Sequence, residues 1–127
     1  MIAIDTSALM AFVLGETQSD ECGRALRHAT ELVMSAGTLA EVLLVAERKN
    51  VGRIVEKLID DLGIQIDPVT PAAARRVAAA HSKWGKGLHP AGLNFGDCFA
   101  YEVARTRDCP LLFIGNDFAK TDLRGVL

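Results

Sequence analysis

Four carboxylates of this chain stand where side chains from distant segments of an α/β fold meet. Asp5 and Asp117 follow predicted strands, whereas Glu41 and Asp97 lie near the starts of predicted helices. Strand carboxyl ends and helix amino ends gather ligand-binding groups at one edge of such a sheet. Clustered carboxylates raise one another's pKa, which destabilises a fold unless a cation compensates. Mg²⁺ and Mn²⁺ prefer carboxylate and water oxygens, so the pattern predicts a divalent metal site.

Zinc is disfavoured at this site, because no histidine lies within four residues of any of these acids. Helix amino termini favour ionised carboxylates, which suits a hard cation. Asp5 is also a good candidate for the N-cap of the helix that follows it, so its position alone leaves capping and metal binding equally open.

Capping is an alternative role for the other acids as well. Thr38 and Glu41 have the spacing of a capping box ahead of an apolar run, and this pattern taken alone favours a cap. Asn94 and Asp97 repeat the spacing, but aspartate is short for the reciprocal bond, which weakens the capping interpretation. Asp117 follows an apolar strand, where a turn role is as plausible as metal binding.

The order of elements predicts how these acids are positioned. Strands are expected at 2–4, 32–36, 64–69 and 110–114, with a further strand in the last five residues. Helices are expected at 7–14, 20–29, 38–50, 52–62, 70–84 and 94–107, with a loop at 85–93 and a turn or short helix at 115–122. This alternation predicts an α/β domain of three layers, in which helices flank a mainly parallel sheet of four to five strands.

Length and composition indicate one globular domain over residues 1–127, with half of the residues hydrophobic and a net charge of −2. The cysteines, Cys22, Cys98 and Cys109, have no metal-site spacing and are expected to be buried free thiols, which indicates a reducing compartment. No apolar run approaches the length of a membrane span, and the amino terminus has no signal-peptide pattern. We therefore expect a cytoplasmic protein without membrane association.

Four sequence segments, in this order, carry a family resemblance. They are IDTSAL at 4–9, SAGTLAEV at 35–42, NFGDCFAY at 94–101 and GNDFAKTD at 115–122. Together they span the chain, which resembles a PIN-domain ribonuclease of the VapC type, the toxin of bacterial toxin–antitoxin pairs. Two positions depart from the family pattern. Ile114 stands where many relatives have lysine, and relatives vary between Asp and Asn at Asn116.

The resemblance implies metal-dependent hydrolysis of RNA phosphodiester bonds. Asp5 and Asp97 would bind Mg²⁺ or Mn²⁺ directly, while Glu41 and Asp117 would hold a second ion or orient its water ligands. A water nucleophile would leave a 5′-phosphate and a 3′-hydroxyl. The hydroxyls and amide that would orient the acids by hydrogen bonds are those of Thr6, Ser7, Asn116 and Thr121.

RNA must be held by cations, because an acidic cluster repels it. Arg75, Arg76, Lys83 and Lys86 lie on or beside the alanine-rich helix and are candidates for phosphate binding. Trp84 is a candidate for stacking on an unpaired base. A solvated helix face with a half-buried tryptophan is the more favoured interpretation of the same residues.

Partner proteins are expected on two apolar helix faces, 9–14 and 42–45. These faces exceed what a small core needs and fit a homodimer or a helix of an antitoxin laid into a groove. The resemblance adds that an antitoxin segment blocks the acidic site.

Two other functions compete with the ribonuclease. A haloacid-dehalogenase-like phosphatase also places an aspartate after its first strand, but it requires a second aspartate where Ser7 stands. A PIN-fold interaction protein without activity is the other alternative, and the presence of all four acids argues against it.

Overall fold

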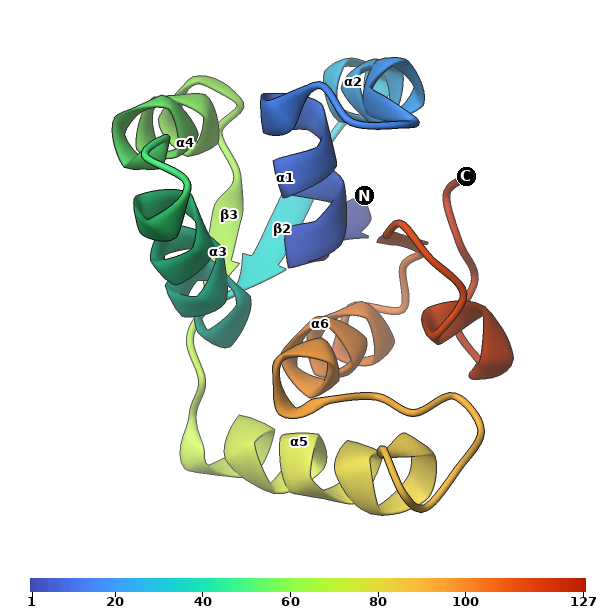
Figure 1. Cartoon of the computed structure of the whole chain (residues 1–127). Coiled ribbons are helices and arrows are strands. Elements are labelled where there is room, and N and C mark those ends of the chain that lie inside the picture. Colours follow the sequence, from blue (N-terminus) through green and yellow to red (C-terminus); the bar gives the residue numbers. More distant parts are fainter.

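The central sheet is fully parallel, so the carboxyl ends of all four strands lie at the same edge. The computed structural model describes residues 1–127. Its elements are β1 (Ile2–Ile4), α1 (Thr6–Leu14), α2 (Ser19–His28), β2 (Leu32–Ser35), α3 (Ala36–Arg48), α4 (Gly52–Asp61), β3 (Gln65–Asp67), α5 (Pro71–Trp84), α6 (Phe95–Thr106), β4 (Leu111–Leu112) and the short 3₁₀ helix η1 (Phe118–Lys120). The four strands lie in the order β3-β2-β1-β4 (Figure 1). The predicted parallel α/β fold is confirmed.

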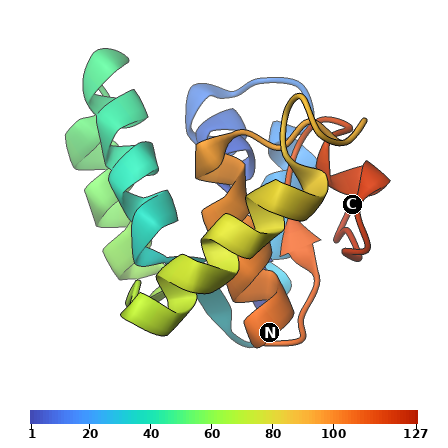
Figure 2. The same ribbon diagram turned by 90° about the horizontal axis from the view of Figure 1, so that it is seen from below.

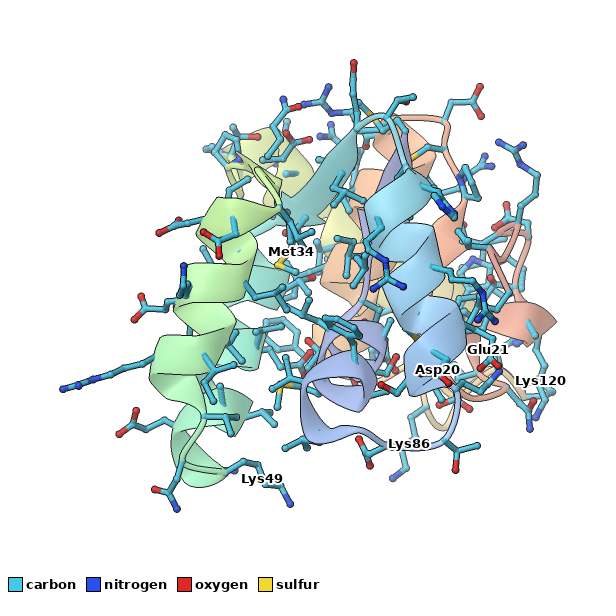
Figure 3. All side chains as sticks on the ribbon, turned by 90° about the horizontal axis from the view of Figure 1, so that it is seen from above. Asp20, Glu21, Met34, Lys49, Lys86 and Lys120 are labelled. Carbon is cyan, nitrogen blue, oxygen red and sulfur yellow. The ribbon has the colours of Figure 1, made fainter.

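Alternation of side chains along the strands gives the sheet two apolar faces. Ala3 and Val33 pack into one cluster with residues of α5 and α6. Ile4 and Met34 point to the other face, where they pack with residues of α1 to α4. Figure 3 shows Met34 inside the molecule, in agreement with its full burial. Successive strand residues face opposite sides, so short apolar strands buried on both faces are what three layers require.

Helices α5 and α6 form the layer on the first face. Figures 1 and 2 show α5 lying across the outer side of α6, which itself packs on the sheet. Thr70 caps α5 by accepting a hydrogen bond from the amide of Ala73, and Pro71 is its first residue, as the sequence predicted. Arg76 of α5 donates two hydrogen bonds to Glu102 of α6, at 3.1 and 2.9 Å. This ion pair joins the two helices across their contact.

The chain terminus differs from the expectation. A fifth strand was predicted in the last five residues, but only an isolated parallel bridge between Leu111 and Gly125 forms there. The amide of Leu111 donates to the carbonyl of Arg124, and the amide of Val126 donates to the carbonyl of Leu111. β4 has only two residues and pairs through both of them with β1, whereas only Leu111 bridges to the terminal segment. The terminal segment therefore covers the β4 edge without extending the sheet.

The three cysteines, Cys22, Cys98 and Cys109, are free and buried, as predicted. None of the helices has the length and apolar character needed to cross a membrane.

Candidate metal centre

Asp5 links the central strand β1 to helix α1 at the carboxyl edge of the sheet. It is the N-cap of α1, and its Oδ2 accepts hydrogen bonds from the amide of Ser7 at 3.1 Å and from the Ser7 hydroxyl at 2.6 Å. Asp5 is only 4% exposed, and its Oδ1 is buried with no hydrogen-bond partner. Capping thus occupies one carboxylate oxygen and leaves the other available to a ligand. The two roles that the sequence left open for Asp5 are compatible.

Burial governs the protonation of Asp5. Desolvation raises the pKa of this carboxyl to about 6, against two hydrogen bonds from Ser7 that lower it. The charges of Asp97 and Glu41 raise the pKa further, although less than burial does. The three acids therefore lie near enough for electrostatic coupling.

Ser7 ties this acid to the neighbouring strand. Its hydroxyl donates to Asp5 and accepts a hydrogen bond from the amide of Ile114 at 3.0 Å, just beyond β4. The predicted orienting role of Ser7 toward Asp5 matches these contacts.

Glu41 is held by a residue far away in sequence. The Thr6 hydroxyl donates to Oε1 of Glu41 at 2.6 Å. The predicted capping box of Thr38 with Glu41 is wrong, because α3 begins earlier: Ser35 is the N-cap and accepts from the amide of Gly37. Thr38 lies inside the helix, fully buried, with its hydroxyl unpartnered. Glu41 is therefore free of any capping role and contacts Thr6 instead.

Asp97 does form the capping box that the sequence interpretation considered weak. Its Oδ2 accepts from the amide of Asn94 at 3.0 Å, and Oδ1 of Asn94 accepts from the amide of Asp97 at 2.8 Å, so a complete capping box forms at the start of α6. The aspartate side chain is therefore long enough to accept the reciprocal hydrogen bond of the capping box. Partial burial raises the pKa of Asp97, and the charges of Glu41 and Asp117 raise it further.

Two glycines allow α3 and α6 to approach each other at the site. A Cβ atom on Gly96 would overlap the carboxylate of Glu41, and a Cβ atom on Gly37 would overlap the ring of Phe99. Sequence analysis did not single out either glycine, although Gly96 directly precedes Asp97 in the first turn of α6. Their missing side chains let Glu41 lie against the backbone beside Asp97.

Asp117 is held differently. It is exposed and precedes η1 without making a side-chain capping bond. Its neighbour Phe118 is buried and packs on Phe113, with ring centroids 5.2 Å apart. Thr121 donates to the carbonyl of Phe118 at 2.6 Å and accepts from the amide of Leu123, so it braces this turn and makes no bond to an acid.

Asn116 is exposed, as is Asp117 beside it. The orienting role assigned to Asn116 stays a prediction.

The oxygen atoms of the acids are of the type that binds a divalent cation. No three of the His, Cys, Asp and Glu side chains, as they stand, form a group that could hold a metal ion. Asp5 nevertheless offers a buried oxygen with no donor, and Gly96 gives the Glu41 carboxylate its place next to Asp97. A hard divalent cation suits these oxygen ligands. The assignment of the individual ligands stays a prediction.

The candidate RNA-binding residues divide into two groups. Arg75, Lys83 and Lys86 are exposed and unengaged by any acid, whereas Arg76 is paired with Glu102. Burial of Trp84 argues against its predicted stacking on a base. Trp84 is only 9% exposed, and its indole donates to the hydroxyl of Tyr101 at 2.9 Å. The alternative of a packed tryptophan is correct.

Comparisons with known proteins agree with this architecture. The chain matches the PIN domain family over residues 2–123. It is 39% identical to ribonuclease VapC42 of Mycobacterium tuberculosis over 125 residues, which cover 95% of each chain. It is 42% identical to ribonuclease VapC36 of the same organism over an alignment of 130 positions, which covers 98% of this chain and 94% of the relative.

Solved structures show the same fold. VapC20 of Mycobacterium tuberculosis, described as a toxin that cleaves the sarcin–ricin loop, superposes with a TM-score of 0.81 at 14% identity over 99% of this chain and 98% of its own. A toxin–antitoxin complex from Klebsiella pneumoniae superposes with a TM-score of 0.74 at 18% identity over 96% of this chain and 93% of the matched chain. The family match over nearly the whole chain, together with these relatives, establishes that the protein belongs to the PIN domain family and, within it, to the VapC ribonucleases.

Proposed function

We propose that this protein hydrolyses RNA phosphodiester bonds with Mg²⁺ or Mn²⁺ and acts in the cytoplasm as the toxin of a toxin–antitoxin pair. One observation supports the chemical part of the proposal: Asp5 has a buried Oδ1 without a hydrogen-bond partner, and its carboxylate is electrostatically coupled to Glu41 and Asp97. A buried oxygen without a donor costs free energy unless a ligand compensates it. A divalent cation is the ligand that this oxygen set suits.

Asp5 and Asp97 would hold the cation, while Glu41 and Asp117 would bind a second ion or orient water. A bound Mg²⁺ or Mn²⁺ would polarise a phosphoryl oxygen and lower the pKa of a water ligand. Ser7 and Thr6 fix the Asp5 and Glu41 carboxylates by hydrogen bonds of 2.6 Å each. Such bonds keep the acids oriented while RNA enters.

Water is the nucleophile in this proposal, so the products carry a 5′-phosphate and a 3′-hydroxyl. End-group analysis of cleaved RNA tests this directly. A 2′,3′-cyclic phosphate would exclude water as the attacking group, since that product arises from attack by the RNA's own 2′-hydroxyl.

Cleavage of RNA by the purified protein tests the proposal as a whole. We expect cleavage only with added Mg²⁺ or Mn²⁺, and its loss in Asp5→Ala and in Asp97→Ala. Glu56→Gln, at an exposed position on α4, is the matched control and is expected to retain activity. Cleavage that persists in both acid variants would reveal a contaminant and would leave the proposal without support.

A generic phosphate monoester in the same assay tests the phosphatase alternative. Ser7 occupies the position where that chemistry needs a second aspartate, and its hydroxyl is already bonded to Asp5 and Ile114. We expect no turnover of the monoester.

The antitoxin has a candidate groove beside the acids. A cavity of about 450 Å³ is lined by Thr6 and Ser7, which bond to the acids, and by apolar residues that include Met10, Val45 and Ile114. Much of the apolar face predicted to bind partners is core, since Leu9 and Val42 are fully buried, so this cavity is what remains for a helix of the partner. The matched chain from Rickettsia felis comes from a complex named VapBC2. Val45→Asp is expected to abolish capture of a co-expressed antitoxin while leaving RNA cleavage intact.

A homodimer is the oligomeric state that we propose, with exposed apolar side chains on α3 and α4, Leu44 and Ile54, as candidate contacts. Sedimentation velocity measures it, and a monomer at all concentrations would contradict it.

A further inference from the structure

Phe95 is the most exposed large hydrophobic side chain of the protein. It is 70% exposed, although it is the first residue of α6 and lies two positions before Asp97. Gly96, between them, lies against the carboxylate of Glu41. An aromatic ring thus stands in solvent in the same helix turn as Asp97, next to the glycine that approaches Glu41.

The ring of Phe95 is held in place. It packs edge to face on Phe99, with centroids 4.9 Å apart and an interplanar angle of 78°. Phe99 in turn is half-buried and lies over Gly37 of α3, where no side chain stands between them. The exposed ring therefore rests on the α3–α6 contact that also positions Glu41, so little side-chain freedom is lost when a ligand binds it.

A cation lies in the loop that leads into α6. The amide of Lys86 donates to the carbonyl of Leu93 at 2.9 Å, and the amide of Leu93 donates to the carbonyl of Trp84 at 3.0 Å. These bonds close the loop between α5 and α6 and hold Lys86 next to the segment that leads into Phe95. Figure 3 shows the Lys86 side chain extending into solvent.

We propose that Phe95 stacks on an unpaired nucleobase of RNA whose phosphodiester lies at the carboxylates, and that Lys86 binds a neighbouring phosphate. This inference rests on the proposed ribonuclease function. Unpaired bases stack on aromatic side chains with little sequence preference, and flanking cations follow the backbone. Phe95 takes the role that the buried Trp84 cannot have.

A second copy of the chain is the competing occupant of this surface. The cores of protein interfaces are depleted of charged residues. Phe95 instead lies in the helix turn that carries Asp97 and next to Gly96, which approaches the Glu41 carboxylate, while Lys86 lies in the loop that leads into this turn. Acids that can hold a cation, together with a nearby lysine, suit a phosphodiester. The charge distribution therefore favours RNA.

Steady-state cleavage of single-stranded RNA with Mg²⁺ tests the stacking role. Phe95→Tyr keeps an aromatic face, whereas Phe95→Leu keeps only apolar bulk. Removal of one base–aromatic stack is expected to raise KM roughly 10-fold in Phe95→Leu and Phe95→Ala, with kcat within about 2-fold of the parent. Phe95→Tyr and the Glu56→Gln control are expected to keep the parental KM.

Fluorescence gives a readout that does not need catalysis. Trp84 is the only tryptophan and is buried, so Phe95→Trp adds one exposed indole. With EDTA present, a short unpaired RNA is expected to quench this added emission. A duplex of the same sequence is expected to quench it much less.

Salt dependence tests Lys86. Each phosphate contact to a single strand contributes about 0.7 to the slope of log affinity against log salt, so Lys86→Gln is expected to reduce the slope by about 0.7. Lys49→Gln, at the far end of α3, is the matched control and keeps the slope; Figure 3 shows both lysines in solvent.

Unchanged KM in Phe95→Leu, together with absent quenching, would overturn the inference. A fall in sedimentation coefficient with unchanged KM in Phe95→Ala would assign the surface to a second copy of the chain and would overturn it as well. If the parental protein cleaves no RNA with either metal, the proposed function fails, and this result is distinct from either outcome at Phe95.

Discussion

Two parts of the acidic site are built on different principles. Glu41 and Asp97 lie in helices and Asp5 caps α1, and each accepts a hydrogen bond from a defined donor: Ser7 for Asp5, Thr6 for Glu41 and the Asn94 amide for Asp97. Asp117 lies between β4 and η1, exposed and without a side-chain capping bond.

Three of the acids are therefore held by hydrogen bonds to their own side chains, whereas the position of Asp117 depends on the packing of the residues that follow it. Asp117 depends on the burial of Phe118 and on the attachment of the following segment, in which Asp122 accepts a hydrogen bond from Tyr101 at 2.8 Å. Preorganised ligands are expected to contribute more to catalysis than ligands that must settle on binding, because the latter lose conformational freedom at each turnover.

Replacing one acid from each part gives the largest contrast. Asp5→Asn removes a buried ligand and is expected to lower kcat/KM by about 10³-fold, the equivalent of several kcal/mol of charge stabilisation. Asp117→Asn is expected to lower it only about 10- to 100-fold. RNA cleavage at saturating Mg²⁺ measures both, and a larger loss at Asp117 would reverse the ranking of the two parts.

The two parts are also expected to differ in how the stability of the protein changes with pH. The pKa of Asp5 is about 6 in the folded protein against an ordinary value of 3.8, so the folded state binds this proton more tightly than the unfolded chain. The associated stability is fully present below pH 3.8 and is lost as the pH rises through 6, by about 3 kcal/mol in all.

Chemical denaturation with EDTA present, between pH 4 and 7.5, measures this loss. Asp5→Asn is expected to remove that part of the pH dependence, and Asp117→Asn, at an exposed position, is the control. Identical pH profiles for the parent and Asp5→Asn would show that burial does not destabilise this carboxylate.

Gly96→Ala probes how the fixed acids are arranged. The new methyl group would overlap the Glu41 carboxylate, which is the mobile end of a side chain, so Glu41 moves away from Thr6 while the backbone stays. Activity is expected to fall about 10- to 100-fold. The free energy of unfolding is expected to change by no more than about 1 kcal/mol, because alanine favours the helix.

Gly52→Ala, in the first turn of α4, is the matched control for a new methyl group on a helix and is expected to retain activity. Full activity in Gly96→Ala would mean that the position of Glu41 is not critical.

The smallest effect is expected from weakening the attachment of the segment that follows Asp117. Tyr101→Phe removes the link between Trp84 and Asp122 and leaves the indole Nε1 without its partner. A loss of about 1 kcal/mol in unfolding free energy is expected. We expect activity to fall by less than about 10-fold, in the range of an indirect, orienting contact. A loss as large as that of Asp117→Asn would show that this link controls the acid.

Sequence patterns predicted the fold well and the site only in part. The Thr70-Pro71 start of α5 was readable because capping and proline act within one turn. The same reasoning failed for Thr38 and Glu41, because Ser35 begins the helix three residues earlier. It also undervalued the cap formed by Asp97, whose reach depends on the geometry of the turn.

Burial was the property that local patterns predicted least. Trp84 and Phe95 are both aromatic residues at helix ends, yet one is packed against Tyr101 and the other is in solvent. Which of them is exposed depends on how α5 crosses α6, and this packing joins residues far apart in the chain.

The sequence by itself determined the alternation of strands and helices, the placement of four acids at their junctions and the resemblance to the PIN domain family. These properties follow from periodicity, short-range capping chemistry and motif order. Only the tertiary structure decided that Thr6 holds Glu41 across 35 positions of sequence, that Gly96 makes room for that carboxylate and that Phe95 stays exposed beside Asp97. Contacts between distant segments require the packed chain, because their partners are chosen by the arrangement of the layers.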